Sequence, residues 1–191
     1  FSYYQWWKNL DKFILSIIIT LFSIGLFFSL VSTSLIASDK LETNSYFFFF
    51  KHLIFVFVGL VIIFIFSYME QKFLYKFSIY IFFLSLIMLF LVPIVGIEVK
   101  GSKRWLDLFF LPRFQPVEII KPFLIVTLAL MLTIQNRRLY FKYFLSALFL
   151  FPILILLIYQ PDIGQTLLIT MVWLAIIFVS GINIFVFSLF F

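Results

Sequence analysis

The sequence predicts an all-α fold of the polytopic membrane class, on the strength of three observations. Hydrophobic residues make up 65% of the 191 residues and charged residues only 12%, whereas soluble chains carry about 25% charged residues. The apolar residues form long runs, and a helix of about 20 apolar residues crosses a bilayer. These runs lack the polar–apolar alternation of transmembrane barrel strands. We therefore expect membrane-crossing helices in a single transmembrane domain over residues 1–191.

About six complete spans are expected along the chain. Residues 1–10 precede them and contain tyrosine, tryptophan and lysine, which are typical of a membrane interface. The expected spans are residues 13–37, 46–68, 77–97, 116–134, 143–159 and 163–180. A seventh run opens at Gly181 and reaches Phe191 with about half the length that a span needs. Because residue 1 is not methionine either, we expect the N-terminal part of a longer protein with a truncated seventh helix.

The scarcity of certain residue types limits the chemistry of the chain. The sequence contains no cysteine, which leaves no disulfide or thiol chemistry. Its one histidine, His52, opens the second expected span and is interpreted as an interfacial residue, which removes most kinds of transition-metal site. No cofactor follows from the sequence, and a divalent cation stays an open alternative. The formal charge of +6 favours anionic lipid headgroups or a phosphorylated ligand as partners, and no nucleic acid is expected.

The distribution of lysine and arginine predicts the orientation of the spans. On one side of the membrane these cations are spread over every loop, as is typical of the cytoplasmic side. On the other side, four of them lie in one long polar loop, residues 98–115. We therefore place the N-terminus in the cytoplasm and the 98–115 loop in the periplasm, where an anionic ligand would explain its cations. The short corner at residues 160–162 falls on the same face, so the loop and the corner can meet.

Two ionisable residues, Glu118 and Lys121, lie inside an otherwise apolar span, where charged groups are costly and mark functional sites. Pro116 suits the first position of a helix, which places Glu118 in the first turn, where the helix dipole favours a carboxylate. Residues three apart share a helix face, so Glu118 and Lys121 can form an ion pair. Pro122 lacks an N–H group and is expected to kink the helix. Two interpretations stay open: a polar cavity reached from the outer surface, or an ion pair that only fixes helix packing.

The loop and the corner contain further candidates. Lys103 and Arg104 precede Trp105, and lysine and arginine are the side chains that bind phosphate; general attraction to lipid headgroups is the alternative. Asp162 follows Pro161 at the start of a span, either as a helix cap or as a functional acid in series with Gln165. It is a weak candidate for a catalytic residue.

At three stretches the chain resembles the SEDS family, the FtsW/RodA group of polytopic bacterial membrane proteins. These stretches are Gly101–Leu106, Gln115–Pro122 and Gln160–Thr166. The Asp-Ile-Gly-Gln-Thr form of the third, with Trp173 downstream, is closer to the FtsW, cell-division branch than to the RodA, elongation branch. The resemblance covers essentially the whole sequence and implies a fold of ten helices in the bacterial inner membrane.

The resemblance also implies an activity, a substrate and partners. It implies a peptidoglycan glycosyltransferase that polymerises lipid II, a disaccharide-pentapeptide on an undecaprenyl diphosphate, during septal cell-wall synthesis. It implies assembly with a class B penicillin-binding protein and other division proteins at the septum. Glu118 and Lys121 match the acid–base pair of the family's fourth helix, Lys103 and Arg104 its basic outer loop, and Asp162 its corner acid. The residues expected to bind substrate are Lys103, Arg104, Gln115, Glu118, Lys121 and Asp162.

The chain also departs from the family pattern. Val117 stands where the family usually has serine, and Ser102 where alanine is common. The aspartate proposed as the catalytic base of the family lies in a later outer loop, so the sequence as given is not expected to be catalytically competent. Two other functions stay open: a flippase or transporter of a lipid-linked precursor, and a non-catalytic scaffold of the division machinery.

Overall fold

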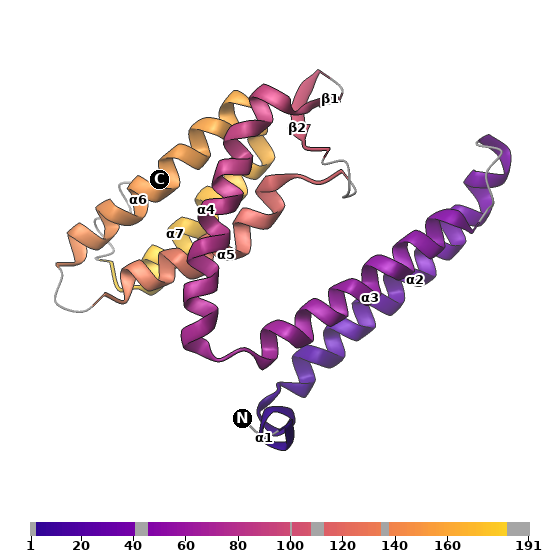
Figure 1. Ribbon diagram of the computed structural model, residues 1–191, viewed down its shortest axis with the longest axis horizontal. Helices are drawn as coiled ribbons and strands as arrows, with labels where there is room; N and C mark the ends of the chain where they lie inside the picture. Colours follow the sequence, from indigo (N-terminus) through magenta and orange to yellow (C-terminus); the bar gives the residue numbers. More distant parts are fainter. Residues whose placement is uncertain (1–2, 41–45, 100, 108–112, 135–137, 183–191) are drawn as a thin grey trace. The chain divides into compact units, whose positions relative to one another are not determined.

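The computed structural model describes residues 3–40, 46–99, 101–107, 113–134 and 138–182. Within these ranges the chain is helical apart from a small β-hairpin (Figure 1). The chain divides into two compact units, residues 1–70 and 71–191, and each is described by itself. The single domain expected from the sequence stays a prediction.

The first unit is a helical hairpin preceded by a short helix. It contains α1 (Tyr3–Asn9), α2 (Lys12–Lys40) and α3 (Phe47–Tyr68). The Asp11 carboxylate starts α2 by accepting bonds from the N–H groups of Phe13 and Ile14, at 2.9 and 3.1 Å, which satisfies donors that a helix start leaves open. The Trp6 indole donates to the Ser67 hydroxyl at 3.2 Å, which joins α1 to the end of α3. The segment expected at the membrane interface, residues 1–10, therefore contains helix α1, which packs against the helical hairpin of α2 and α3.

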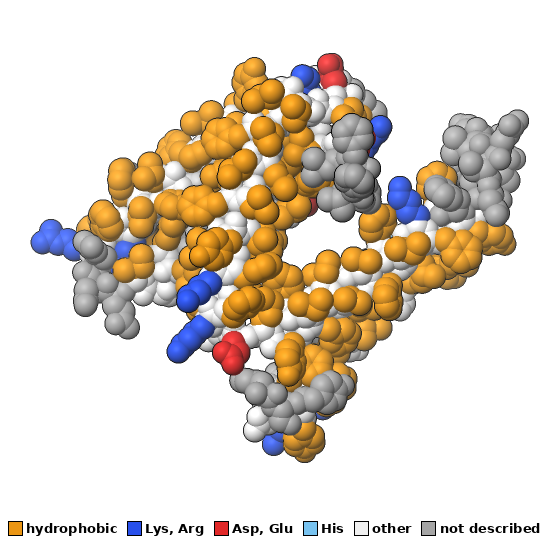
Figure 2. All heavy atoms as spheres, in the orientation of Figure 1, with side chains coloured by type: hydrophobic (Ala, Val, Ile, Leu, Met, Phe, Trp, Pro, Cys, Tyr) orange, Lys and Arg blue, Asp and Glu red, His pale blue; other side chains and the backbone are white. Residues whose placement is uncertain are grey.

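The described residues of the second unit form four helices that run alternately up and down, with the β-hairpin between the first two (Figure 1). Its elements are α4 (Gln71–Val95), β1 (Ile97–Val99), β2 (Ser102–Trp105), α5 (Pro116–Leu132), α6 (Leu139–Tyr159) and α7 (Ile163–Val179). Leucine, isoleucine and phenylalanine from the four helices form one core, including Phe82, Leu128, Ile153 and Ile177. Figure 2 shows hydrophobic side chains covering the sides of these helices and charged side chains near their ends, as a membrane span requires.

The buried hydroxyl groups of this unit bond within their own helices. Ser78 and Ser85 donate to the carbonyls of Leu74 and Ile81, both at 2.8 Å. Thr127 donates to the Phe123 carbonyl at 2.7 Å. An unsatisfied polar group is costly in a membrane interior, so these internal bonds let small polar residues occupy the helix interface.

The fold-class prediction is confirmed, because every expected complete span is a helix. Within the described residues, four helices are long and apolar enough to cross a membrane: 12–32, 48–68, 71–95 and 139–159. Helices α5 and α7 have 17 residues each, the lower end of the spanning range. Two helices begin earlier than predicted, α4 at Gln71 and α6 at Leu139, because polar residues at the membrane surface continue the helix. The seventh run lies outside the described residues from Asn183 onward.

The 98–115 loop contains a β-hairpin that the sequence did not reveal. Strands β1 and β2 pair antiparallel, with Ile97 opposite Trp105 and Glu98 opposite Lys103. Gly101 in the turn has φ +80°, a conformation that glycine adopts readily. At Gly96, where α4 gives way to the hairpin, an added Cβ would lie 2.2 Å from the Val92 carbonyl oxygen, so only glycine fits. The periplasmic location of this loop stays a prediction.

Candidate functional site

The candidate site lies at the end of the second unit where the hairpin, the start of α5 and the corner between α6 and α7 come together. Pro116 is the first residue of α5, and its N-terminal neighbour Gln115 has an extended backbone at φ −99° and ψ 120°. This start places Glu118 in the first turn and Lys121 one turn further in. The predicted ion pair is present, with Lys121 Nζ 2.6 Å from Glu118 Oε2. The Lys121 side chain is 21% exposed and that of Glu118 is 51% exposed, so the ammonium is the more enclosed partner.

Gln165 of α7 completes a triangle with this pair. Its carboxamide oxygen accepts a bond from Lys121 Nζ at 3.1 Å, and its carboxamide nitrogen donates to Glu118 Oε1 at 2.9 Å. Each of the three side chains therefore contacts the other two, and α5 is joined to α7 by polar bonds. Gln165 was noted in the sequence but was not among the predicted binding residues. Its spacing of three from Asp162, which places both on one helix face, is the signal that could have identified it.

Asp162 is the N-cap residue of α7. Its side chain accepts a bond from the Gln165 backbone N–H at 3.4 Å, and the residue is only 8% exposed. Its Oδ2 lies 3.7 Å from Arg104 Nη1. The capping interpretation is therefore confirmed, and the carboxylate also faces a guanidinium group from the hairpin.

Arg104 connects the hairpin to the corner between α6 and α7. Besides its ion pair with Asp162, it donates to the Pro161 carbonyl at 2.6 Å and to the Gln160 carbonyl at 3.4 Å. The last carbonyls of a helix lack partners within it and carry partial negative charge, so a cation stabilises them. The predicted meeting of loop and corner is confirmed. Arg104, Asp162, Gln165, Glu118 and Lys121 form one continuous set of polar contacts, which we call the α5–α7 polar network.

Two predicted binding residues lie outside the α5–α7 polar network. The Lys103 ammonium contacts the Pro93 carbonyl oxygen at 3.5 Å and lines a recess beside the hairpin. Gln115 makes no side-chain capping bond, and its carbonyl accepts a bond from the Glu118 N–H at 3.1 Å. The structure therefore joins four of the six predicted residues and leaves these two apart. Substrate binding by any of the six stays a prediction.

The α5–α7 polar network combines two cations, two carboxylates and a carboxamide. Such a set can bind and orient a polar ligand and can place positive charge near an anionic one. In the part of the chain that the structure describes, no group of three or more histidine, aspartate or glutamate side chains is arranged to hold a metal ion. The chemistry that these residues themselves can supply is therefore hydrogen bonding and charge.

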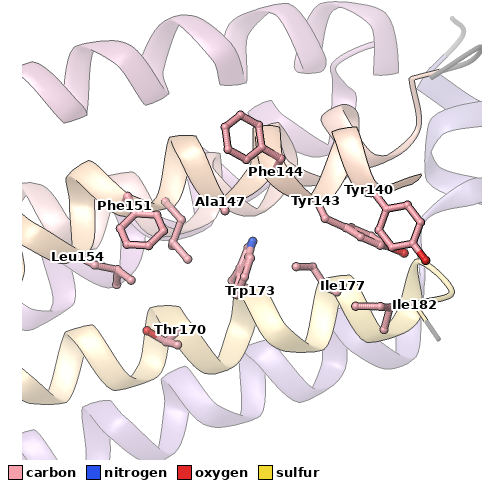
Figure 3. A pocket seen from close by; sticks show the side chains of 11 residues that line it. Tyr140, Tyr143, Phe144, Ala147, Phe151, Leu154, Thr170, Trp173, Ile177 and Ile182 are labelled. Carbon is pink, nitrogen blue, oxygen red and sulfur yellow. The ribbon is translucent and has the colours of Figure 1, made fainter. Parts of the chain in front are cut away.

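A second, apolar pocket lies between α6 and α7 and has a volume of about 460 Å³. Figure 3 shows aromatic side chains from α6, such as Phe144 and Phe151, on one side and Trp173 of α7 on the other. Trp173 is 9% exposed, and its indole nitrogen donates to the Ser146 hydroxyl at 3.1 Å. This buried contact makes Trp173 part of the packing between α6 and α7. The pocket offers apolar surface without a charged group.

Comparison with known proteins finds a matching family and several similar bacterial proteins. A family described as cell cycle protein, comprising FtsW, RodA and SpoVE, matches residues 11–191. A probable peptidoglycan glycosyltransferase FtsW of Coxiella burnetii is 32% identical over 179 residues, which are 91% of this chain and 48% of the relative. The chain spans about half the length of the curated relatives that it matches.

Solved structures agree on the fold. The crystal structure of the rod shape determining protein RodA of Thermus thermophilus has a TM-score of 0.76 at 24% identity, covering 96% of this chain and 60% of that one. At this identity the likeness bears on the fold alone. A chain of a peptidoglycan synthase complex, described for the coordination of polymerization and crosslinking, has a TM-score of 0.68 at 27% identity. It covers 86% of this chain and 47% of that one.

Proposed function

Because the chain belongs to the cell cycle protein family of FtsW, RodA and SpoVE, we propose that the protein is a peptidoglycan glycosyltransferase. In this proposal it polymerises lipid II into glycan strands during septal cell-wall synthesis. The observation that carries the proposal is the α5–α7 polar network, which keeps a lysine, a glutamate and a glutamine in mutual contact at the end of two apolar helices. Ionisable groups at such a position carry function in membrane proteins.

The residues of the α5–α7 polar network suit the positioning of a sugar-diphosphate lipid. A glycosyl transfer that releases a diphosphate needs positive charge near the departing phosphates. Lys121 supplies an ammonium group whose direction is fixed by Glu118 and Gln165. Arg104 supplies a guanidinium group fixed at the corner between α6 and α7. We therefore assign these two cations to the diphosphate side of the reaction.

The same transfer needs a base that accepts a proton from the acceptor sugar hydroxyl. Among the described residues of the network, the carboxylates are those of Glu118 and Asp162. Both oxygens of Glu118 are engaged, by Lys121 and by Gln165, and Asp162 caps α7 while facing Arg104. We therefore assign Glu118 and Asp162 to the orientation of the site and assign no proton transfer to either.

The proposal includes a location and partners. The chain is a multi-pass membrane protein, which we place in the bacterial inner membrane at the division septum with the N-terminus in the cytoplasm. We propose that it works with a class B penicillin-binding protein and other division proteins. The likeness at 27% identity to a chain of a peptidoglycan synthase complex supports such a partnership.

Reconstitution of the full-length protein tests this function. The protein and its class B penicillin-binding protein would be incorporated into liposomes that carry fluorescent lipid II, and both glycan polymer and transbilayer movement of lipid II would be measured. We expect polymer that requires both proteins. Movement of lipid II without polymer would replace the proposal with the flippase alternative, and the absence of both, with division intact in cells, would favour the scaffold.

A further inference from the structure

A small recess lies between the β-hairpin and the end of α6, apart from the Glu118–Lys121 pair. It has a volume of about 280 Å³, and its wall includes Pro93, Ser102, Lys103, Tyr159 and Gln160. We call it the hairpin recess. Its wall shares the corner between α6 and α7 with the contacts of Arg104 and includes no residue of the Glu118–Lys121–Gln165 triangle. The recess is therefore a second polar concavity at the same end of the helical unit.

Lys103, the cation of the hairpin recess, differs from the neighbouring cations in its contacts. Around it, Arg104, Lys121 and Arg113 each pair with a carboxylate. Within the described part of the chain, Lys103 forms no ion pair, although Glu98 lies opposite it in the hairpin register. A lysine ammonium has three N–H donors, and that of Lys103 makes one long contact, 3.5 Å to the Pro93 carbonyl. Its remaining donors are therefore available to a ligand in the recess.

The size and surroundings of the hairpin recess define the ligand. Its volume lies just below the range for ligand pockets, about 300–1,000 Å³, so it fits a headgroup and not a whole lipid. Tyr159 on its rim is the last residue of α6 and is 75% exposed, and tyrosine in that position is typical of the headgroup layer. Ser102 also lines the recess, but its hydroxyl donates to the Val99 carbonyl at 3.4 Å, so the Lys103 ammonium is the group that would attract an anion. Lysine binds phosphate as a point charge.

We propose that the hairpin recess binds the phosphate of a membrane lipid through Lys103. The phosphate is that of an anionic phospholipid, because the diphosphate of the proposed polymerase reaction is already assigned to Arg104 and Lys121. The site is separate from the α5–α7 polar network and goes beyond the proposed polymerase function. It would hold a lipid headgroup against the hairpin while Arg104 keeps the hairpin on the corner.

Binding measurements on the full-length protein in nanodiscs test the proposal. The probes are photoreactive phosphatidylglycerol, undecaprenyl diphosphate and phosphatidylcholine, each compared for the wild type, Lys103→Met and Lys103→Arg. Arg113→Gln is the matched control, because Arg113 lies in the same loop with a side chain 63% exposed and its ion pair points to Asp107 instead of the recess. Lys103→Arg keeps the charge and is expected to retain most of the binding.

We expect Lys103→Met to weaken the binding of phosphatidylglycerol by about tenfold, the loss typical of one charge-assisted contact. Arg113→Gln should change it by less than about twofold, since exposed pairs contribute little. A loss confined to undecaprenyl diphosphate would make Lys103 part of the substrate site of the proposed polymerase and would overturn the proposal. Equal losses in Lys103→Met and Arg113→Gln would mean general charge attraction and would overturn the proposal, as would unchanged binding. Because the readout is binding, a failure of the polymerase assay would leave this result unaffected.

Discussion

Helix α7 passes through two contrasting regions. Its first turn carries Asp162 and Gln165, which contact Arg104, Glu118 and Lys121 in the α5–α7 polar network. Its later turns line the apolar pocket shared with α6 (Figure 3). In the first region charged groups contact one another across elements, whereas in the second neutral groups bond to each other, the Trp173 indole to the Ser146 hydroxyl and the Ser180 hydroxyl to the Tyr143 hydroxyl. Helices in this unit therefore pack together without charged groups. We infer that the charged residues near the start of α5 and α7 are present for function.

The largest expected effect is on Lys121. Lys121→Met removes the ammonium that Glu118 and Gln165 orient, and lipid II polymerisation should fall by about 100-fold, the loss typical of one electrostatic group at a transition state. Stability should fall by no more than about 1 kcal/mol, because Glu118 is half exposed and water screens the pair. Polymer gels and thermal unfolding in detergent measure the two effects.

The control for this prediction is Lys142→Met at the opposite end of the unit. Lys142 donates to the Leu132 carbonyl at 3.0 Å and contacts no residue of the α5–α7 polar network. Its replacement should leave polymerisation within about twofold and lower stability by about 1 kcal/mol, since it removes the hydrogen bond from the Lys142 ammonium to the Leu132 carbonyl. Equal loss of polymerisation in Lys121→Met and Lys142→Met would show that the loss is not specific to the α5–α7 polar network.

A smaller loss is expected at Gln165. Gln165→Leu keeps the approximate size of the side chain and removes both bonds to the Glu118–Lys121 pair. The pair itself can persist, so activity should fall by about tenfold, equivalent to about 1.4 kcal/mol of lost orientation. Gln165→Glu should lower the polymerisation activity more than Gln165→Leu does, because it places a second carboxylate beside Glu118. The polymerisation rates of the two variants give their order, and the reverse order would contradict the bridging role of the carboxamide.

The contact between Arg104 and Asp162 is expected to be energetically modest. Their charged atoms are 3.7 Å apart, and their side chains are 33% and 12% exposed. A double-mutant cycle with Arg104→Gln and Asp162→Asn should therefore give a coupling free energy of about 0.5–1 kcal/mol. Thermal unfolding of the four proteins measures it. A coupling indistinguishable from zero would mean that Arg104 holds the corner through the Gln160 and Pro161 carbonyls alone.

The smallest effect on activity is expected in the apolar pocket. Trp173→Phe removes the bond to the Ser146 hydroxyl and keeps an aromatic ring in place. Stability should fall by about 0.6–1 kcal/mol, as for other hydrogen bonds between membrane helices. Polymerisation should stay within about twofold of the wild type. Ser146→Ala should produce a similar loss of stability, and a large loss of activity in either variant would extend the functional region into the pocket.

The elements that the sequence predicted well are those governed by local rules. The spans follow from long apolar runs, the start of α5 from Pro116, and the pairing of Glu118 with Lys121 from their spacing on one helix. The meeting of the 98–115 loop with the corner at Asp162 followed from counting spans. Each of these depends on residues close together in sequence or on the alternation that a membrane imposes.

The features that the sequence did not reveal depend on contacts between distant segments. The β-hairpin has strands of 3 and 4 residues, too short for a clear alternation, and Gly101 is the main sign of its turn. The bridging role of Gln165 requires α7 to lie beside α5, which no local pattern specifies. Likewise, the separation of Lys103 from Arg104 arises because neighbouring residues of a strand point to opposite faces, which was not applied to a segment expected to be a loop.

Exchanging the two charges of the pair gives the most direct test of whether Glu118 and Lys121 are functional or only structural. The double variant Glu118→Lys with Lys121→Glu keeps an ion pair at the same spacing and moves the ammonium group by one turn of α5. Our account predicts that stability returns to within about 1 kcal/mol of the wild type, while lipid II polymerisation stays at the level of Lys121→Met. Recovery of polymerisation to the wild-type rate would show that the pair only fixes helix packing and would contradict the account.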